Sequence, residues 1–157
     1  MSQKSLANLL KAAVIVAGIL GIILYCVVFP LEGSSLAEKA GNGCFWPWMI
    51  FLWISAVPCY VVLAKFWRIC VSIGQDHSFC HENAERLKDI SLLALGDTIY
   101  FFVGNVIFLL LNLSHPSIFL ASLVVEFVGF AVCIAAAALS RLVGRAADMQ
   151  DENDLTI

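Results

Sequence analysis

The chain has 157 residues, of which 61% are hydrophobic and only 13% are charged. A soluble globular domain carries about 25% charged residues, so this composition excludes an ordinary soluble protein and indicates a membrane protein. The length is that of a single domain. The net charge of −3 says little by itself, because the acidic and basic residues occupy different parts of the sequence.

Long apolar runs account for most of the chain. They cover about residues 9–29, 46–64, 92–113 and 117–142. A helix rises 1.5 Å per residue, so each run is long enough to cross a hydrocarbon core of about 30 Å. Backbone polar groups in lipid must be satisfied within the protein. The sequence therefore predicts an all-α integral membrane protein, a four-helix antiparallel bundle formed by residues 1–157 as a single domain.

The first run has an alternative interpretation as a cleaved signal peptide. Ser35-Leu36-Ala37 offers small residues at a suitable spacing for cleavage. The apolar stretch after Lys11 is, however, longer than the core of about 7 to 15 residues that is usual for signal peptides. We therefore expect it to be a membrane span.

The basic residues lie on one side of the predicted spans. Of the nine Lys and Arg residues, all but Lys39 lie at or before the start of the first run, between the second and third, or at or after the end of the fourth. By the positive-inside rule, both termini and the middle loop are predicted to be cytoplasmic.

Small and polar residues mark the faces through which the spans are expected to pack, because helices in lipid associate through close packing and hydrogen bonds. In the first run, Ala13, Ala17 and Gly21 form a small-residue ridge that suits packing within the chain or a homodimer. The fourth run places the following residues on one helical face: Ser122, Glu126, Gly129, Cys133, Ala136 and Ser140.

Two acidic residues lie inside the predicted membrane region. Glu126, Asn105 and Ser55 are expected at comparable depths and could form a polar layer. Such a layer is typical either of a proton or ion path or of a carboxyl group that locks helices together. Asp97 is closer to the cytoplasmic end, where an ion-pair staple is expected with a basic residue that ends a span: Lys11, Lys65 or Arg141.

The cysteines and histidines do not form a recognised metal motif. Cys26 and Cys44 both approach the outer side, which permits a disulfide. The middle loop contains Cys70, His77, Cys80 and His81, but their spacing matches no known zinc site. The chain also lacks a nucleophile–base set, a phosphate-binding loop and paired carboxylates, so we expect no metal, no cofactor and no enzymatic activity.

Two polar segments are predicted on the cytoplasmic side. The first, at about residues 80–91, is a short helix with a Glu82–Arg86 pair that runs into the third span. The second is an acidic tail at residues 146–157. Its composition is compatible either with a solvated, frayed terminus or with a segment that a partner recognises.

These segments carry a family resemblance. The pattern Gly74-x4-Phe79-x2-Glu82-Asn83-Ala84-x-Arg86-Leu87-x2-Ile90 and the closing Glu152-Asn153-Asp154-Leu155-Thr156-Ile157 resemble the signatures of bacterial domain-of-unknown-function family 2975. One departure is Cys80, where that family usually has Ser or Thr; a thiol is a poorer helix N-cap than a hydroxyl.

The resemblance implies a multi-pass protein of the bacterial cytoplasmic (inner) membrane with a regulatory or partner-binding role. Members are often encoded beside a small helix-turn-helix regulator. The implied partners are the lipid bilayer and a soluble cytoplasmic protein such as that regulator, without direct nucleic-acid contact. The implied partner-binding residues are Phe79, Glu82, Asn83, Arg86 and Leu87 in the loop, and Asn153, Asp154, Leu155, Thr156 and Ile157 in the tail.

Two alternatives stay open. The tail could instead fold back on Arg86, Lys88 and Arg68 and so close the bundle. The protein could also be a small transporter or ligand carrier that uses Glu126 and Asn105 within the membrane.

Overall fold

The computed structural model describes residues 3–31, 34, 45–75 and 78–154, and all regular structure in these ranges is helical. The elements are α1 (Gln3–Ile23), the π-helical segment η1 (Leu24–Val28), α3 (Phe45–Gly74), α4 (His81–Leu110) and α5 (Pro116–Asp154). In these ranges, four helical stretches are long and apolar enough to cross a membrane. The predicted all-α fold with four spans is confirmed.

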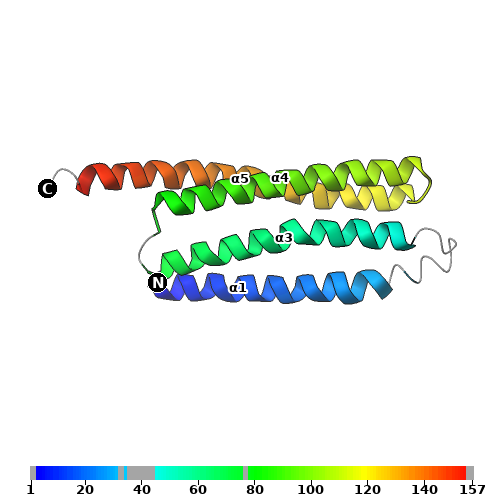
Figure 1. Cartoon of the computed structure of the whole chain (residues 1–157), viewed down its shortest axis with the longest axis horizontal. Helices are drawn as coiled ribbons and strands as arrows, with labels where there is room; N and C mark the ends of the chain where they lie inside the picture. Colours follow the sequence, from blue (N-terminus) through cyan, green and yellow to red (C-terminus); the bar gives the residue numbers. More distant parts are fainter. Residues whose placement is uncertain (1–2, 32–33, 35–44, 76–77, 155–157) are drawn as a thin grey trace.

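Successive helices run antiparallel along a common direction (Figure 1). The start of α1, the end of α5 and the connection from α3 to α4 lie at one end of the molecule, which we call the terminal end. The turn between α4 and α5 lies at the opposite end. The structure thus gathers the termini and the middle loop at one end, as the charge pattern predicts.

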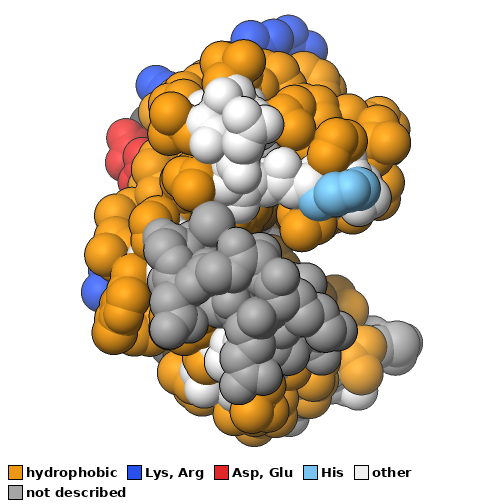
Figure 2. Space-filling model, turned by 90° about the vertical axis from the view of Figure 1, so that its right-hand side faces the viewer, with side chains coloured by type: hydrophobic (Ala, Val, Ile, Leu, Met, Phe, Trp, Pro, Cys, Tyr) orange, Lys and Arg blue, Asp and Glu red, His pale blue; other side chains and the backbone are white. Residues whose placement is uncertain are grey.

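The helices form a bundle that is open along one side. α1 packs against α3, α3 against α4 and α4 against α5, whereas α1 does not pack against α5 within the described helices. Seen from the end that carries the α4–α5 turn, the molecule has a C-shaped outline with a hollow on one side (Figure 2). The described side chains in this view are mostly hydrophobic, and such side chains are compatible with contact to lipid tails.

The α4–α5 contact uses the small-residue face that the sequence predicts for the fourth span. Ser122, Glu126, Cys133 and Ala136 are all buried. The Ser91 hydroxyl of α4 donates a hydrogen bond of 3.0 Å to the Cys133 carbonyl oxygen. Small side chains allow the two backbones to approach closely, and this makes interhelical bonds to the backbone possible.

The α3–α4 contact is formed around an aromatic group near the α4–α5 turn. The Phe51 ring stacks on Tyr100 and Phe101, with centroid distances of 4.9 and 5.3 Å. It lies directly over Gly104, where a side chain would coincide with the ring. The absence of a side chain at Gly104 therefore allows the Phe51 ring to pack against α4.

Candidate functional site

The start of α4 is held against the end of α3 by Asn83. This side chain is only 1% exposed. Its Nδ2 group donates to Ser72 Oγ at 3.1 Å and to the Ser78 carbonyl oxygen at 3.2 Å, and its Oδ1 accepts a 3.0 Å hydrogen bond from Arg86. Asn83 therefore links α3, the connection and α4, which is a structural role.

Helix α4 begins where the sequence predicts. Cys80 is the extended N-cap residue, and its side chain makes no capping hydrogen bond. The Cys80 carbonyl oxygen accepts from the backbone N–H groups of Asn83 and Ala84. Arg86 pairs with Glu82, as the spacing of four residues predicts. The helix then continues without a break into the third span, so the predicted continuity is confirmed.

Leu87 faces the interior. It is 8% exposed and forms a cluster with Ile69 of α3, Ile90 of α4 and Ala136 of α5. Because Asn83 and Leu87 are buried, neither can touch a partner in this structure. The prediction that both contact a partner directly is corrected: they fix the position of the α4 start, whereas Phe79 beside them is 57% exposed.

The acidic tail is a helix in the part that the structure describes. α5 continues through the predicted tail to Asp154, while Leu155, Thr156 and Ile157 lie outside the described residues. Its anchor is Ala147, which is 2% exposed. At the terminal end, α5 extends beyond the start of α4 (Figure 1).

His81 connects this extension to α4. Its Nε2 lies 3.2 Å from Asp151 Oδ2 and 3.6 Å from Asp148 Oδ1. The described part of the tail therefore lies beside the start of α4, so the two predicted polar segments are close together. The described part of the tail continues along the axis of α5. It does not fold back on Arg86, Lys88 and Arg68, which was the alternative expected from the sequence.

A polar cluster lies inside the spans around Asp97. The Ser55 hydroxyl donates to Asp97 Oδ2 at 3.2 Å, and the Cys59 thiol approaches the same oxygen at 3.5 Å. Tyr25, in the π-helical segment, lies close to Ser55 and Cys59. The cluster thus joins α3 and α4 and reaches the segment that follows α1.

This cluster replaces two arrangements that the sequence predicts. Asp97 bonds to Ser55 and Cys59, and Lys65 pairs with Asp89 at 2.7 Å, so the predicted ion-pair staple is wrong. The predicted layer of Glu126, Asn105 and Ser55 is also wrong in its membership, because Ser55 bonds to Asp97.

Asn105 and Glu126 are buried nearer the α4–α5 turn. The Asn105 amide donates to the Phe101 carbonyl oxygen of its own helix at 2.8 Å. Among the described residues, Asn105 Oδ1 and Glu126 Oε1 are buried without a hydrogen-bond partner, and so is Asp97 Oδ1. Three polar oxygens thus retain unused hydrogen-bonding capacity at positions that lie within the apolar helices.

Sequence reasoning missed the role of Cys59 in the Asp97 cluster. We treated no cysteine as a hydrogen-bond donor, although Ser55 and Cys59 are four residues apart and share a helix face. Of Cys26 and Cys44, between which the sequence permits a disulfide, Cys44 lies outside the described residues. His77, one of the four cysteine and histidine residues considered for zinc in the middle loop, also lies outside the described residues.

The fold and these sites define a multi-span helical membrane protein with polar groups inside its spans and an acidic helix at one end. Residues 34–157 match the family described as "Protein of unknown function (DUF2975)", and the chain belongs to that family. It is similar to "Uncharacterized membrane protein YoaS" of Bacillus subtilis (strain 168), with 28% identity over 152 residues, 94% of this chain and 95% of the relative. No solved structure matches it significantly.

Proposed function

We propose that this membrane protein lies in the bacterial inner membrane with its terminal end in the cytoplasm, and that it docks a soluble regulatory partner there. The observation that carries the proposal is the extension of α5, which leaves the apolar region as an acidic helix and lies against His81 at the start of α4. A helix held in this way presents its charges in a fixed geometry.

The docking surface consists of exposed groups at the terminal end. It includes Phe79, Glu82, Asp148, Asp151 and Glu152, which are all exposed. An exposed aromatic side chain beside charged groups is a common anchor of protein interfaces. Asn83 and Leu87 hold this surface in position from beneath. The proposal also includes the residues that follow Glu152 in the sequence: Asn153, Asp154, Leu155, Thr156 and Ile157.

The charge of the surface favours a partner with a basic face. Complementary charges raise association rates and select among partners. A DNA-binding regulator carries such a face, because DNA affinity comes largely from Lys and Arg contacts to phosphates. Capture at the membrane would therefore compete with DNA for the same basic surface. The family resemblance supports a helix-turn-helix regulator as this partner.

Neutralising the acidic helix is expected to weaken capture about tenfold. The variant carries Asp148→Asn, Asp151→Asn and Glu152→Gln. Exposed ion pairs contribute about 0.5 kcal/mol each, and three of them approach the 1.4 kcal/mol that corresponds to a factor of ten. Binding is measured by fluorescence anisotropy between the full chain in nanodiscs and a purified helix-turn-helix protein encoded beside its gene, at low and high salt.

Glu85→Gln is the control, because Glu85 is exposed on α4 and outside the proposed docking surface. Its affinity should stay within twofold of the wild type. A chain that ends after Gln150 gives a second test. Capture that survives this truncation contradicts the proposal, whereas loss of thermal stability with no effect on capture supports a purely intramolecular role for the tail.

A second candidate function is supported by the buried oxygens of Glu126 and Asn105, which lack hydrogen-bond partners among the described residues. An unsatisfied carboxyl group inside the membrane suits transient binding of a proton or cation. Glu126→Gln is expected to abolish pH-driven flux in proteoliposomes while the melting temperature stays within about 2 °C. Unchanged flux, or no flux in the wild type, removes this candidate.

A further inference from the structure

A hollow of about 220 Å³ lies between the beginning of α1 and the end of α3, at the terminal end and away from the docking surface. Its walls include Lys4, Asn8 and Lys11 from α1, and Val71, Gly74 and Gln75 from α3. The hollow is independent of the α4–α5 groups that carry the proposed docking function.

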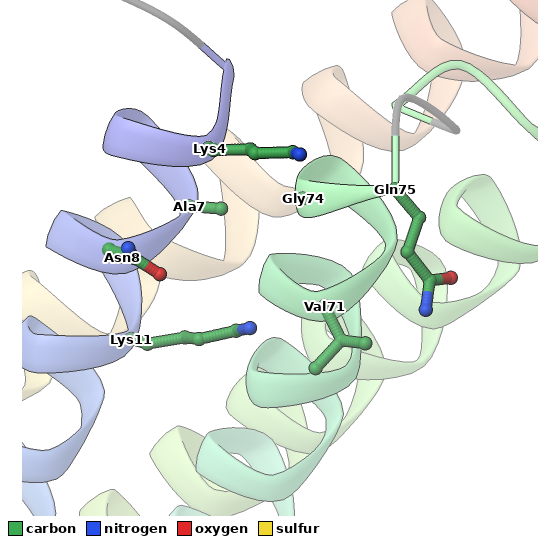
Figure 3. Close-up of a pocket in the computed structure, with 7 residues that line it drawn as sticks. All are labelled: Lys4, Ala7, Asn8, Lys11, Val71, Gly74 and Gln75. Carbon is green, nitrogen blue, oxygen red and sulfur yellow. The ribbon is translucent and has the colours of Figure 1, made fainter.

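Two small residues make the hollow possible. Ala7 is 1% exposed and packs against Gly74, so that a Cβ atom at Gly74 would lie 3.3 Å from the Ala7 Cβ. The helices therefore approach closely at this point. Lys4 and Lys11 stand one turn before and one turn after Ala7 on the same face of α1. Both lysine side chains extend across the gap toward α3, with Asn8 between them (Figure 3).

The charge in the hollow is positive. Among the described residues, Lys4 and Lys11 form no ion pair, and none of the residues that line the hollow is acidic. The partial positive charge at the N-terminus of α1 adds to the two ammonium groups. An anion in this position would be favoured by charge and would have the Asn8 amide as a further hydrogen-bond donor.

The depth of the hollow is indicated by Trp67. The Lys11 ammonium group lies 5.9 Å from the centre of the Trp67 ring, in a cation–π contact. Tryptophan is enriched where the hydrocarbon core meets the headgroup layer, and lysines near the end of a span reach the same layer. The hollow thus opens at the level where phosphate groups of lipids are concentrated.

We propose that this hollow binds a phosphate group, with Lys4 and Lys11 as its charged contacts and Asn8 as a donor. The phosphate belongs either to the headgroup of an anionic phospholipid or to a small phosphate ion in the aqueous phase. In either case it joins α1 to α3, the two helices that the ligand touches, and stabilises their contact.

The test measures the thermal unfolding midpoint of the full chain in a neutral detergent. The probes are short-chain phosphatidylglycerol, short-chain phosphatidylcholine and inorganic phosphate. At a hundredfold excess over the dissociation constant, a bound ligand should raise the midpoint by about 5 °C or more. A shift with phosphatidylglycerol alone assigns the site to lipid, and a shift with inorganic phosphate assigns it to the free ion.

Two variants distinguish binding in the hollow from non-specific attraction of anions to the positive charge. The double variant Lys4→Gln, Lys11→Gln removes the charge, and Val71→Phe fills the hollow while leaving both lysines in place. The control Lys88→Gln removes an exposed lysine that does not line the hollow. The shift should disappear in the double variant and in Val71→Phe and persist in the control. The absence of any shift in the wild type, or a shift that both hollow variants retain, overturns the proposal.

Discussion

Replacement of Asn83 by alanine is expected to lower the free energy of unfolding by about 2 to 3 kcal/mol. The change removes three hydrogen bonds, to Ser72, Ser78 and Arg86, from a site that is 1% exposed. A buried polar group left without its partner costs about 1 to 3 kcal/mol, and here several partners lose their bond at once. The measurement is equilibrium unfolding of the protein in mixed detergent micelles.

Lys88→Ala is the matched control, because Lys88 is exposed in the same helix and its change should stay within about 0.5 kcal/mol of the wild type. The double variant with Ser72→Ala should show coupling, since the two side chains bond to each other. If Asn83→Ala weakens partner capture without changing stability, the side chain is a contact residue and the structural role assigned to it is wrong.

Gly104→Ala is expected to destabilise the protein by about 1 to 3 kcal/mol. A Cβ atom at this position would lie 2.6 Å from Phe51 Cζ and closer still to Phe51 Cε2. The ring cannot easily move away, because Phe51 is 6% exposed and stacked on Tyr100 and Phe101. Overpacking of this kind forces side chains off their preferred rotamers or shifts the helix.

The same helix offers a control at Gly96, where an added Cβ atom would meet nothing within 4 Å. Gly96→Ala should stabilise the protein by about 0.5 to 1 kcal/mol, because alanine loses less backbone entropy than glycine when a helix forms. Thermal unfolding in the same detergent compares the two variants. Equal effects at both glycines would mean that Phe51 does not pack on α4 as described.

The start of α4 was predictable from local sequence, whereas α3 and α5 extend beyond the apolar runs at residues 46–64 and 117–142, to Gly74 and Asp154. The segment that begins with His81 has an i, i+4 pair and an apolar stripe, and it continues into an apolar run without a breaking residue. These local features predict one helix, and α4 is one helix from His81 to Leu110. The small-residue face of the fourth span was predictable for the same reason, because positions on one helix have a fixed geometry relative to each other.

The partners of polar side chains on different helices were not predictable in this way. Ser55 was expected beside Glu126 and Asn105 on the basis of depth, but it bonds to Asp97 instead. The offset of one helix along its neighbour depends on how their side chains pack, and one turn of offset moves a side chain by 5.4 Å. Asn83 was assigned to a partner-binding surface from the family resemblance, whereas the end of α3 supplies a buried hydrogen-bond partner for it, Ser72.

The sequence alone determined that the chain crosses a membrane as four helices with its termini and middle loop together, because the length of apolar runs and the placement of charges are properties of single segments. Only the tertiary structure decided that the bundle is open on one side, that Asp97 meets Ser55 and Cys59, and that Lys4 and Lys11 face a hollow beside α3. Those arrangements depend on contacts between segments far apart in the chain, and close packing of whole helix faces selects them.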